Sequence, residues 1–360
     1  MTAPCLVVPI PPTAAFDGPE RWMFDGLERL SVEACVEVYG DGGLAEPARQ
    51  RAAELAQTDY YGHRWAVAVA PDAPERAIGS ALVTLPLHDN RTVADITVTV
   101  AAGFRRRGIG TALLDWAEAA AQAAGRTTIQ SWVEAGRWPE GAPVVHGPEG
   151  GDFPAASPGW ALAQARGYAL AEIEYISLLD LPADPARLAP LQRDADSVTS
   201  DYRLHCWAAD VPAEWRAAYA TLMRRFTEDV PSGGLDYEPE PWDEARLASQ
   251  LRRAAETGMV YQFAAAEHVA TGELAALTTL LWIDQPGRPA IQETTVVLRA
   301  HRGHRLGLWV KLGNLRELAR RRPDAPYVHT QNAAENGPMR RINDKLGFRR
   351  AGAVAAVQKA

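Results

Sequence analysis

The sequence has few cysteines and no long apolar segment. Only three of its 360 residues are cysteine, and they are too widely spaced to form a C-x-x-C pair. This predicts neither a disulfide framework nor a zinc site, so no metal is expected, and it fits a reducing, cytoplasmic environment. No apolar run reaches the length of a membrane span. The N-terminal segment lacks a basic stretch, so we expect a first strand there rather than a signal peptide.

The sequence also lacks an excess of positive charge. It has 37 Lys and Arg against 45 Asp and Glu, a formal net charge of −8. This balance argues against nucleic acid or an anionic membrane as a partner. An apolar content of 47% is typical of a globular protein with an ample core. The length exceeds that of one ordinary compact domain and predicts two.

Residues 98–114 carry the clearest chemical signal. An alternating β-branched run ends in a basic turn with glycines, and an alanine-rich helix follows at once. Glycine lets the backbone approach a ligand, and the first amides of a helix point outward with partial positive charge. Arginines on the rim could reach phosphate oxygens. The turn therefore predicts a pyrophosphate site made by Arg105, Arg106, Arg107, Gly108, Gly110 and Thr111.

A second copy of this unit begins near residue 295. Aligning Arg302 with Arg105 places Val297 on Val100 and Gly307 on Gly110. Arg305 stands where the first copy has Gly108, which weakens the second phosphate site without removing its amides. Two copies at domain-length spacing indicate a duplication. The corresponding candidates are Arg302, Gly303, His304, Arg305 and Gly307.

The spacing Arg-x-x-Gly-x-Gly after Val-x-Val resembles the acetyl-CoA pyrophosphate loop of the GNAT superfamily of N-acetyltransferases. The late segment 332–348, which ends in Leu346-Gly347-Phe348, resembles another segment of that family. The resemblance is closest to tandem, actinobacterial-type members. It implies acetyl-CoA as cofactor, with pantetheine held by backbone near Val98, Val100 and Val297 and by the Asn336 side chain.

The same resemblance implies an α/β (α+β) fold. Two tandem domains would each have a mixed, mostly antiparallel central sheet flanked by helices. We expect an N-terminal domain over residues 1–182, a linker over 183–200 and a C-terminal domain over 201–360.

Family members often use a glutamate on the strand before the loop as the base. Glu293 lies nine residues before Arg302, whereas Asp95 lies ten before Arg105. The two-residue strand period then places Asp95 on the opposite face, which favours Glu293. An exposed strand glutamate without a catalytic role is the alternative.

The usual proton donor for the leaving thiolate is absent. Ala163 and Asn343 stand at the positions where many members have tyrosine. Water would then protonate the thiolate. His301 and His304 flank the second loop, and we expect them to contact phosphate or solvent rather than act as bases.

An acidic segment over residues 227–242 allows two interpretations. Its carboxylates, which include Asp236 and Glu238, could attract a cationic amine in the second domain, or they could be a solvated loop. The Gly/Pro-rich segment 134–158 is likewise either a lid or a tolerated insertion.

These features predict a cytoplasmic N-acetyltransferase that moves an acetyl or short acyl group from CoA to a primary amine of a small molecule. The alternative is a non-catalytic acyl-CoA-binding, sensing or scaffold protein. A homodimer is one option for its assembly. The sequence does not select the acceptor.

Overall fold

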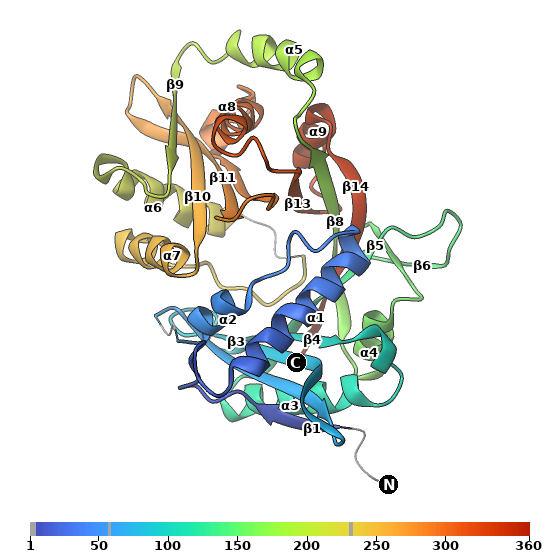
Figure 1. Ribbon diagram of the computed structural model, residues 1–360. Coiled ribbons are helices and arrows are strands. Elements are labelled where there is room, and N and C mark those ends of the chain that lie inside the picture. Colours follow the sequence, from blue (N-terminus) through green and yellow to red (C-terminus); the bar gives the residue numbers. More distant parts are fainter. Residues whose placement is uncertain (1–4, 57–58, 230–232) are drawn as a thin grey trace. The chain divides into compact units, whose positions relative to one another are not determined.

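The computed structural model describes residues 5–56, 59–229 and 233–360 (Figure 1). The chain divides into two compact units. The first contains Met1–Glu174, Ser232–Glu238 and Gly352–Ala360; the second contains Tyr175–Pro231 and Pro239–Ala351. Among the helices in the described ranges, none is long and apolar enough to cross a membrane.

The first unit is built on a mixed sheet with strand order β1-β2-β3-β4-β5-β14. Its neighbours are antiparallel except β4 and β5, which are parallel. Its elements are β1 (Leu6–Pro9), α1 (Arg21–Tyr39), α2 (Ala48–Ala56), β2 (Tyr61–Ala70), β3 (Ala73–Pro86), β4 (Val93–Val100), a 3-10 turn (Ala102–Phe104), α3 (Ile109–Ala123), β5 (Thr128–Gly136), β6 (Val144–His146), β7 (Asp152–Pro154), α4 (Pro158–Ala165) and the first part of β8 (Ala169–Asp180).

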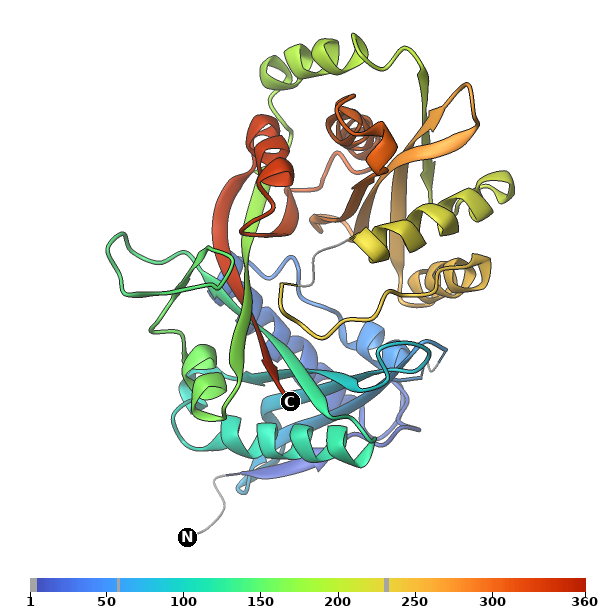
Figure 2. The ribbon, with the colours of Figure 1, turned by 180° about the vertical axis from the view of Figure 1, so that it is seen from behind.

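Helices cover both faces of this sheet. Trp65, Val67 and Val69 alternate along β2 and pack into the cluster that α1 and α2 cover. Ala66 and Ala68 point to the other face and are fully buried. Figure 1 shows α1 in front of the strands, and the reverse view in Figure 2 shows α3 in front of them. The sheet is therefore buried on both sides.

The second unit repeats this plan with strand order β13-β12-β11-β10-β9, in which only β12 and β13 are parallel. Its elements are α5 (Pro185–Asp196), β9 (Tyr202–Ala208), α6 (Ala213–Asp229), α7 (Glu244–Glu256), β10 (Met259–His268), β11 (Glu273–Ile283), β12 (Ala290–Val297), a 3-10 turn (Arg299–His301), α8 (Leu306–Arg321), β13 (Tyr327–Ala333), α9 (Gly337–Leu346) and β14 (Arg349–Lys359).

Two clusters form the core of the second unit. Phe263, Leu277 and Val296 pack with α6 and α7 on one face of the sheet. Ala264 and Leu280 pack with α8 on the other. The same element order in both units confirms the predicted mixed, mostly antiparallel architecture.

The units do not follow the contiguous boundaries predicted from the sequence. Strand β8 crosses from the first unit to the second at Glu174/Tyr175, and β14 crosses back at Ala351/Gly352. The expected linker contains α5, which packs in the second unit. The segment that ends at Glu238, expected in the second domain, belongs to the first unit.

Strand β14 completes the sheet of the first unit. Residues 352–359 pair antiparallel with β5, from Gly352 opposite Gly136 to Lys359 opposite Ile129. The side chains of residues 353–357 are at most 1% exposed. Lys359 Nζ also donates a 3.0 Å hydrogen bond to Glu118 of α3. The last residues of the chain therefore form part of the core of the first unit.

Candidate active sites

In each unit the two parallel strands part after a short ladder. β4 and β5 are paired only from Val93–Asp95 to Thr128–Gln130, although β4 continues to Val100. β12 and β13 are paired only from Ala290–Gln292 to Val328–Thr330, although β12 continues to Val297. The backbone near Val98, Val100 and Val297 therefore faces an opening in the sheet. An extended ligand with amide groups could pair there as a strand does.

The loop after β4 has a backbone that points its amides outward. Arg106 and Gly108 have left-handed φ values of 60° and 82°, and Gly108 is the N-cap of α3. Glycine adopts this conformation at no steric cost. No side chain caps α3, and its first turn contains no acidic residue. The amides at the start of α3, including those of Gly110 and Thr111, therefore have no side-chain cap, and such amides could bind an anion.

The second loop repeats this geometry with the residue types exchanged. Gly303 has φ 92° and Arg305 has φ 57°, and Arg305 is the N-cap of α8. The left-handed position occupied by Gly108 in the first unit is thus occupied by an arginine. Helix α8 also lacks a side-chain cap and an acidic residue in its first turn. Replacement of the glycine has therefore not removed the loop conformation.

The arginines of the loops have different roles. Arg105 Nε donates to the Val100 carbonyl at 3.0 Å, and Arg302 Nε donates to the Val297 carbonyl at 3.3 Å. These equivalent bonds brace the end of the strand. Arg105 also binds both carboxylate oxygens of Glu37, at 2.8 and 2.5 Å. This hydrogen-bonded contact holds the pKa of Glu37 below its usual value.

Only some of the predicted phosphate ligands lie free at the surface. Arg305 pairs with Asp194 at 2.9 Å. Arg106 and Arg107 are exposed, and the Arg107 guanidinium lies 5.5 Å from the centre of the Phe104 ring. His304 is also exposed. Arg106, Arg107 and His304 are therefore the side chains best placed to meet a phosphate, whereas Arg105 shapes the loop.

Gly110 and Gly307 serve helix packing. A Cβ atom on Gly110 would lie 3.2 Å from Leu162 of α4, and one on Gly307 would lie 3.3 Å from Ile342 of α9. Both contacts are tighter than ordinary van der Waals packing. Each glycine thus lets the helix behind the loop approach the last helix of its unit.

Glu293 lies on the face of the sheet that α6 and α7 cover. A bulge between Thr278 and Leu280 sets one residue of β11 opposite two of β12. The pKa of Tyr219 on α6 lies well above its usual value. Burial is the largest cause, and the charges of Tyr261 and Glu293 raise the pKa further. The Glu293 side chain is exposed, yet the protein around it excludes enough water to raise its pKa to about 7.

Asp95 also lies on the face covered by the first two helices, so the sequence-based assignment to the opposite face was wrong. Asp95 stands opposite Thr84, two residues from Leu82, which packs against the α1–α2 cluster. The strand period was counted correctly, but the bulge adds a residue to β12 and shifts its register. The Asp95 side chain is half-buried, and burial raises its pKa to about 7. Each unit thus has one carboxyl group with a raised pKa on this face.

Aromatic side chains surround the Glu293 region. Tyr219 is fully buried and contacts Phe263 edge-on, with ring centres 5.6 Å apart. Trp242 lies 6.1 Å from Tyr219, and Tyr261 stacks on Phe263 at 5.7 Å. Trp242 and Tyr261, which are half-buried, could pack the apolar part of a small acceptor.

The acidic segment contributes to the first unit rather than to the second. The backbone oxygen of Asp236 accepts a 2.8 Å bond from Gln130, which stands opposite Asp95 in the β4–β5 ladder. Glu238 exchanges backbone and side-chain bonds with Asn90. Glu240 instead pairs with Arg246 in the second unit. Neither sequence interpretation describes it fully, because residues 236–238 are hydrogen-bonded to Gln130 and Asn90 of the first unit.

Asn336 has a structural task. Its Oδ1 accepts a 3.2 Å bond from the Met339 amide and so caps α9. Ser157 caps α4 in the same way, with a 3.4 Å bond from Trp160. The sequence comparison missed Ser157 as the counterpart of Asn336. The signal was a cap residue with a proline one or two positions later, which both helix starts have.

His301 differs from the expectation of phosphate or solvent contact. Its Nδ1 lies 3.0 Å from the Tyr202 hydroxyl, and its Nε2 lies 3.4 Å from Glu273. Both ring nitrogens are therefore engaged by the protein. No group of three or more His, Cys, Asp or Glu side chains in the described ranges is arranged to hold a metal ion.

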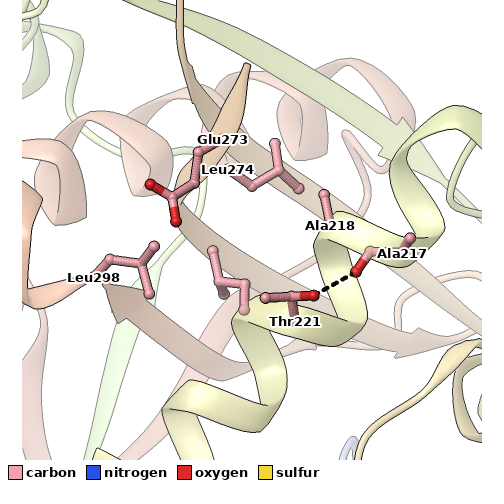
Figure 3. A pocket seen from close by; sticks show the side chains of 7 residues that line it. Ala217, Ala218, Thr221, Glu273, Leu274 and Leu298 are labelled. Atoms are coloured by element: carbon pink, nitrogen blue, oxygen red, sulfur yellow. Dashed lines mark hydrogen bonds between the residues drawn. The ribbon is translucent and has the colours of Figure 1, made fainter. Parts of the chain in front are cut away.

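A shallow hollow of about 250 Å³ lies beside the second loop (Figure 3). Ala218, Thr221 and Leu222 of α6, Leu274 of β11 and Leu298 contribute to its mostly apolar lining. Its one carboxylate, Glu273, binds Arg225 at 3.0 Å. This hollow contains neither loop amides nor Glu293, so we do not assign the chemistry to it.

Comparison with known proteins supports the family suggested by the loops. Residues 41–137 match the model of the acetyltransferase (GNAT) family. A solved tandem GNAT protein from the clavulanic acid biosynthesis pathway, in a form without AcCoA, is 26% identical. Its TM-score is 0.73, and the alignment covers 99% of this chain and 98% of that one. Residues 41–137 thus match the GNAT family, and the whole chain has the fold of a tandem GNAT protein.

A second GNAT structure has the same fold. The GCN5-related N-acetyltransferase from Sphaerobacter thermophilus is 18% identical with a TM-score of 0.65, over 100% of this chain and 96% of that one. No curated protein sequence gives a significant match. The family match includes the first phosphate loop and Asp95, and together with the tandem neighbour it supports an acyltransferase function.

Proposed function

We propose that this tandem GNAT protein transfers an acetyl or short acyl group from CoA to a primary amine of a small molecule, and that both units bind CoA. The observation that carries the proposal is the repeated juxtaposition of three features. Each unit has an opening between parallel strands, an uncapped helix start behind a left-handed loop, and a carboxyl group with a raised pKa on the face of the first two helices.

The residues present fit acetyl-CoA, which would supply the activated acyl group. The helix amides and the exposed Arg106 and Arg107 would hold the pyrophosphate in the first unit. The free strand edges near Val98, Val100 and Val297 would pair with pantetheine amides. In the second unit the amides behind Gly303 and Arg305 do the same work with fewer free cations.

Glu293 and Asp95 would accept the proton of the attacking amine. A base with a pKa of about 7 is ionised in about half of the molecules at neutral pH, and it is basic enough to take a proton in the transition state. Two such groups on equivalent faces favour catalysis over a purely sensing role, because a sensor needs no base. Their negative charge also suits a cationic acceptor.

A small-molecule acceptor accords with two observations. The aromatic side chains near Glu293 can pack an apolar body, and Thr279, opposite the bulge, has a buried hydroxyl without a hydrogen-bond partner in the described part of the chain. The tandem neighbour belongs to a pathway that makes a small molecule. We place the protein in the cytoplasm, where acetyl-CoA and reduced cysteines both occur.

Calorimetric titration with acetyl-CoA tests the proposal. The protein should bind two equivalents, and the double variant Arg107→Glu/Gly108→Asp should bind one, because negative side chains then stand at the first anion site. The matched variant His304→Glu/Arg305→Asp should likewise lose the second equivalent. Arg137→Glu, a charge change at an exposed residue that belongs to neither loop, is the control.

If acetyl-CoA binds, whether as one equivalent or as two, an acceptor screen follows. It measures the release of the CoA thiol in the presence of amines of small metabolites. Absence of acetyl-CoA binding by the unaltered protein would contradict the proposal. Binding without thiol release, for every amine tested, would favour the sensing alternative.

A further inference from the structure

A buried lysine lies behind the second loop. Lys311 of α8 is 2% exposed, although the whole chain has only three lysines. Its Nζ donates a 3.0 Å hydrogen bond to Asn343 of α9 and lies 5.7 Å from the centre of the Phe348 ring. No carboxylate of the described residues pairs with it. Burying an ammonium group without a counter-ion is costly, so such a residue needs an explanation.

The fold does not require this amine. With Gly307 aligned on Gly110, the position of Lys311 corresponds to Leu114 of α3, which is also buried. Asn343 corresponds to Ala163, so the first unit has two apolar residues where the second has a hydrogen-bonded polar pair. A leucine therefore fills the equivalent space in the same architecture, and the lysine of the second unit points to a function.

Lys311 lies next to the opening between β12 and β13. It follows Gly307 by one turn, and Gly307 packs against Val297 and Ile342. Asn343 in turn donates a 2.6 Å bond to Asn332 near the end of β13. Helix α8 covers the face of the sheet opposite to α6 and α7. Lys311 and Glu293 thus approach the opening from opposite faces.

We propose that Lys311 is the acid that protonates the CoA sulfur as it leaves during acyl transfer in the second unit. The inference rests on the proposed function. The acceptor nitrogen bonds to the thioester carbon, Glu293 takes the proton of that nitrogen, and the carbon–sulfur bond breaks with its electron pair on sulfur. The Lys311 ammonium gives one proton to the sulfur, and solvent later returns a proton to the amine.

The electrostatic surroundings of Lys311 suit this role. Burial lowers its pKa to about 7, and no charged side chain of the elements packed on α8 contributes to the shift. Of the titratable residues on β12 and β13, Glu293 and His329 lie on the opposite face, and burial lowers the pKa of His329 to about 4. Arg340, Arg341, Asp344 and Lys345 of α9 are exposed. A developing thiolate would therefore be the nearest anion for Lys311.

The test compares Lys311→Met with Lys345→Met, an exposed lysine on α9, both in the Arg107→Glu/Gly108→Asp background so that CoA binds only to the second unit. Methionine fills the same volume without a charge and should fold. The first readout is the pKa of the bound CoA thiol, which is measured from the ultraviolet absorbance of the thiolate. We expect Lys311 to lower that pKa by about one unit or more, and Lys311→Met to restore the value of free CoA.

The second readout is the pH dependence of acyl transfer. With Lys311 present, the rate should fall on both sides of neutrality, because the acid is lost above about pH 7 and the base below it. Lys311→Met should slow transfer roughly 100-fold and lose the alkaline limb. An unchanged thiol pKa and pH profile in Lys311→Met, with CoA still bound, would overturn the inference and leave the proposed function intact. Failure of the background protein to bind CoA would overturn the second-unit site itself.

Discussion

At the scale of single residues, Glu293 and Asp95 share a setting that strand carboxylates seldom have. Each lies on the face that the first two helices of its unit cover, on the strand before a basic loop, and desolvation by the surrounding protein raises the pKa of each to about 7. The ordinary values are near 4, where both groups would be poor bases at neutral pH. The position of the carboxyl group in the fold thus determines whether it can accept a proton.

We expect Glu293→Gln to abolish the part of the transfer rate that rises with pH through about 7. The raised pKa means that the base is protonated and inactive below this pH and ionised above it, so the rate is lost as the pH falls. Removal of a general base lowers the rate roughly 100-fold or more. The measurement is the pH–rate profile of thiol release, with acetyl-CoA affinity as the control for binding.

Asp95→Asn is the matched variant in the first unit. If both units transfer an acyl group, Asp95→Asn removes the contribution of the first unit to the rate of thiol release. The pH–rate profile should still show an ionisation near pH 7, because Glu293 is unchanged. A profile that survives both substitutions unchanged would remove these carboxyl groups from the mechanism.

The left-handed positions of the two loops make a second prediction at this scale. Gly108→Ala forces a Cβ into a left-handed conformation and should cost about 1–2 kcal/mol. Arg305→Gly relieves the same strain at the equivalent position, but it loses the exposed Asp194 pair, worth about 0–1 kcal/mol, and gives the unfolded chain more freedom. We expect its net effect to be near zero in thermal unfolding. Equal costs for the two substitutions would contradict the repeated geometry.

At the scale of elements, α4 and α9 begin with equivalent N-caps, Ser157 and Asn336. Substitutions at Asn336 can therefore distinguish a structural role in capping α9 from a role in cofactor binding. Asn336→Ala should lower the free energy of unfolding by about 1 kcal/mol, and Asn336→Ser, which copies Ser157, should restore most of it. Acetyl-CoA affinity should change little in the serine variant if the cap is the main role. A large loss of affinity in that variant with normal stability would show that the amide nitrogen contacts the cofactor.

Local signals predicted the strands and helices around the two loops. They did not always predict on which face of the sheet a side chain lies. The two basic loops predicted a strand before and a helix after each loop, because each of these signals lies within a few residues. The bulge opposite Thr279 could not be read in this way, since it depends on pairing with a neighbouring strand. It reversed the relation between Asp95 and Glu293. The role of Lys311 was missed because a lysine among the apolar residues of α8 shows no partner in the sequence.

At the scale of the whole molecule, the chain does not form two successive domains. Hydrogen bonds between residues more than a hundred positions apart bring Asp236 and Gln358 into the first unit. Duplication predicts two similar units but not which copy each final strand joins, because that choice depends on long-range pairing. Residues 352–359 therefore pair with β5, a strand that precedes them by more than two hundred positions.

We expect deletion of Gly352–Ala360 to unfold the first unit and leave the second folded. The deletion exposes the edge of β5 and removes five residues that are at most 1% exposed, together with the Lys359–Glu118 pair. The loss should approach the whole stability of a domain, about 5–15 kcal/mol. Calorimetry should then show one unfolding transition in place of those of the full chain.

A chain of residues 1–182 should fail to fold for the same reason, and joining a copy of residues 352–360 to its end through a flexible linker should restore folding at least in part. The segment 233–238 would still be missing, so the restored unit should stay less stable than in the full protein. If residues 1–182 fold alone with the stability of the first unit, β14 is dispensable there, and the contiguous boundary is the better description of the protein.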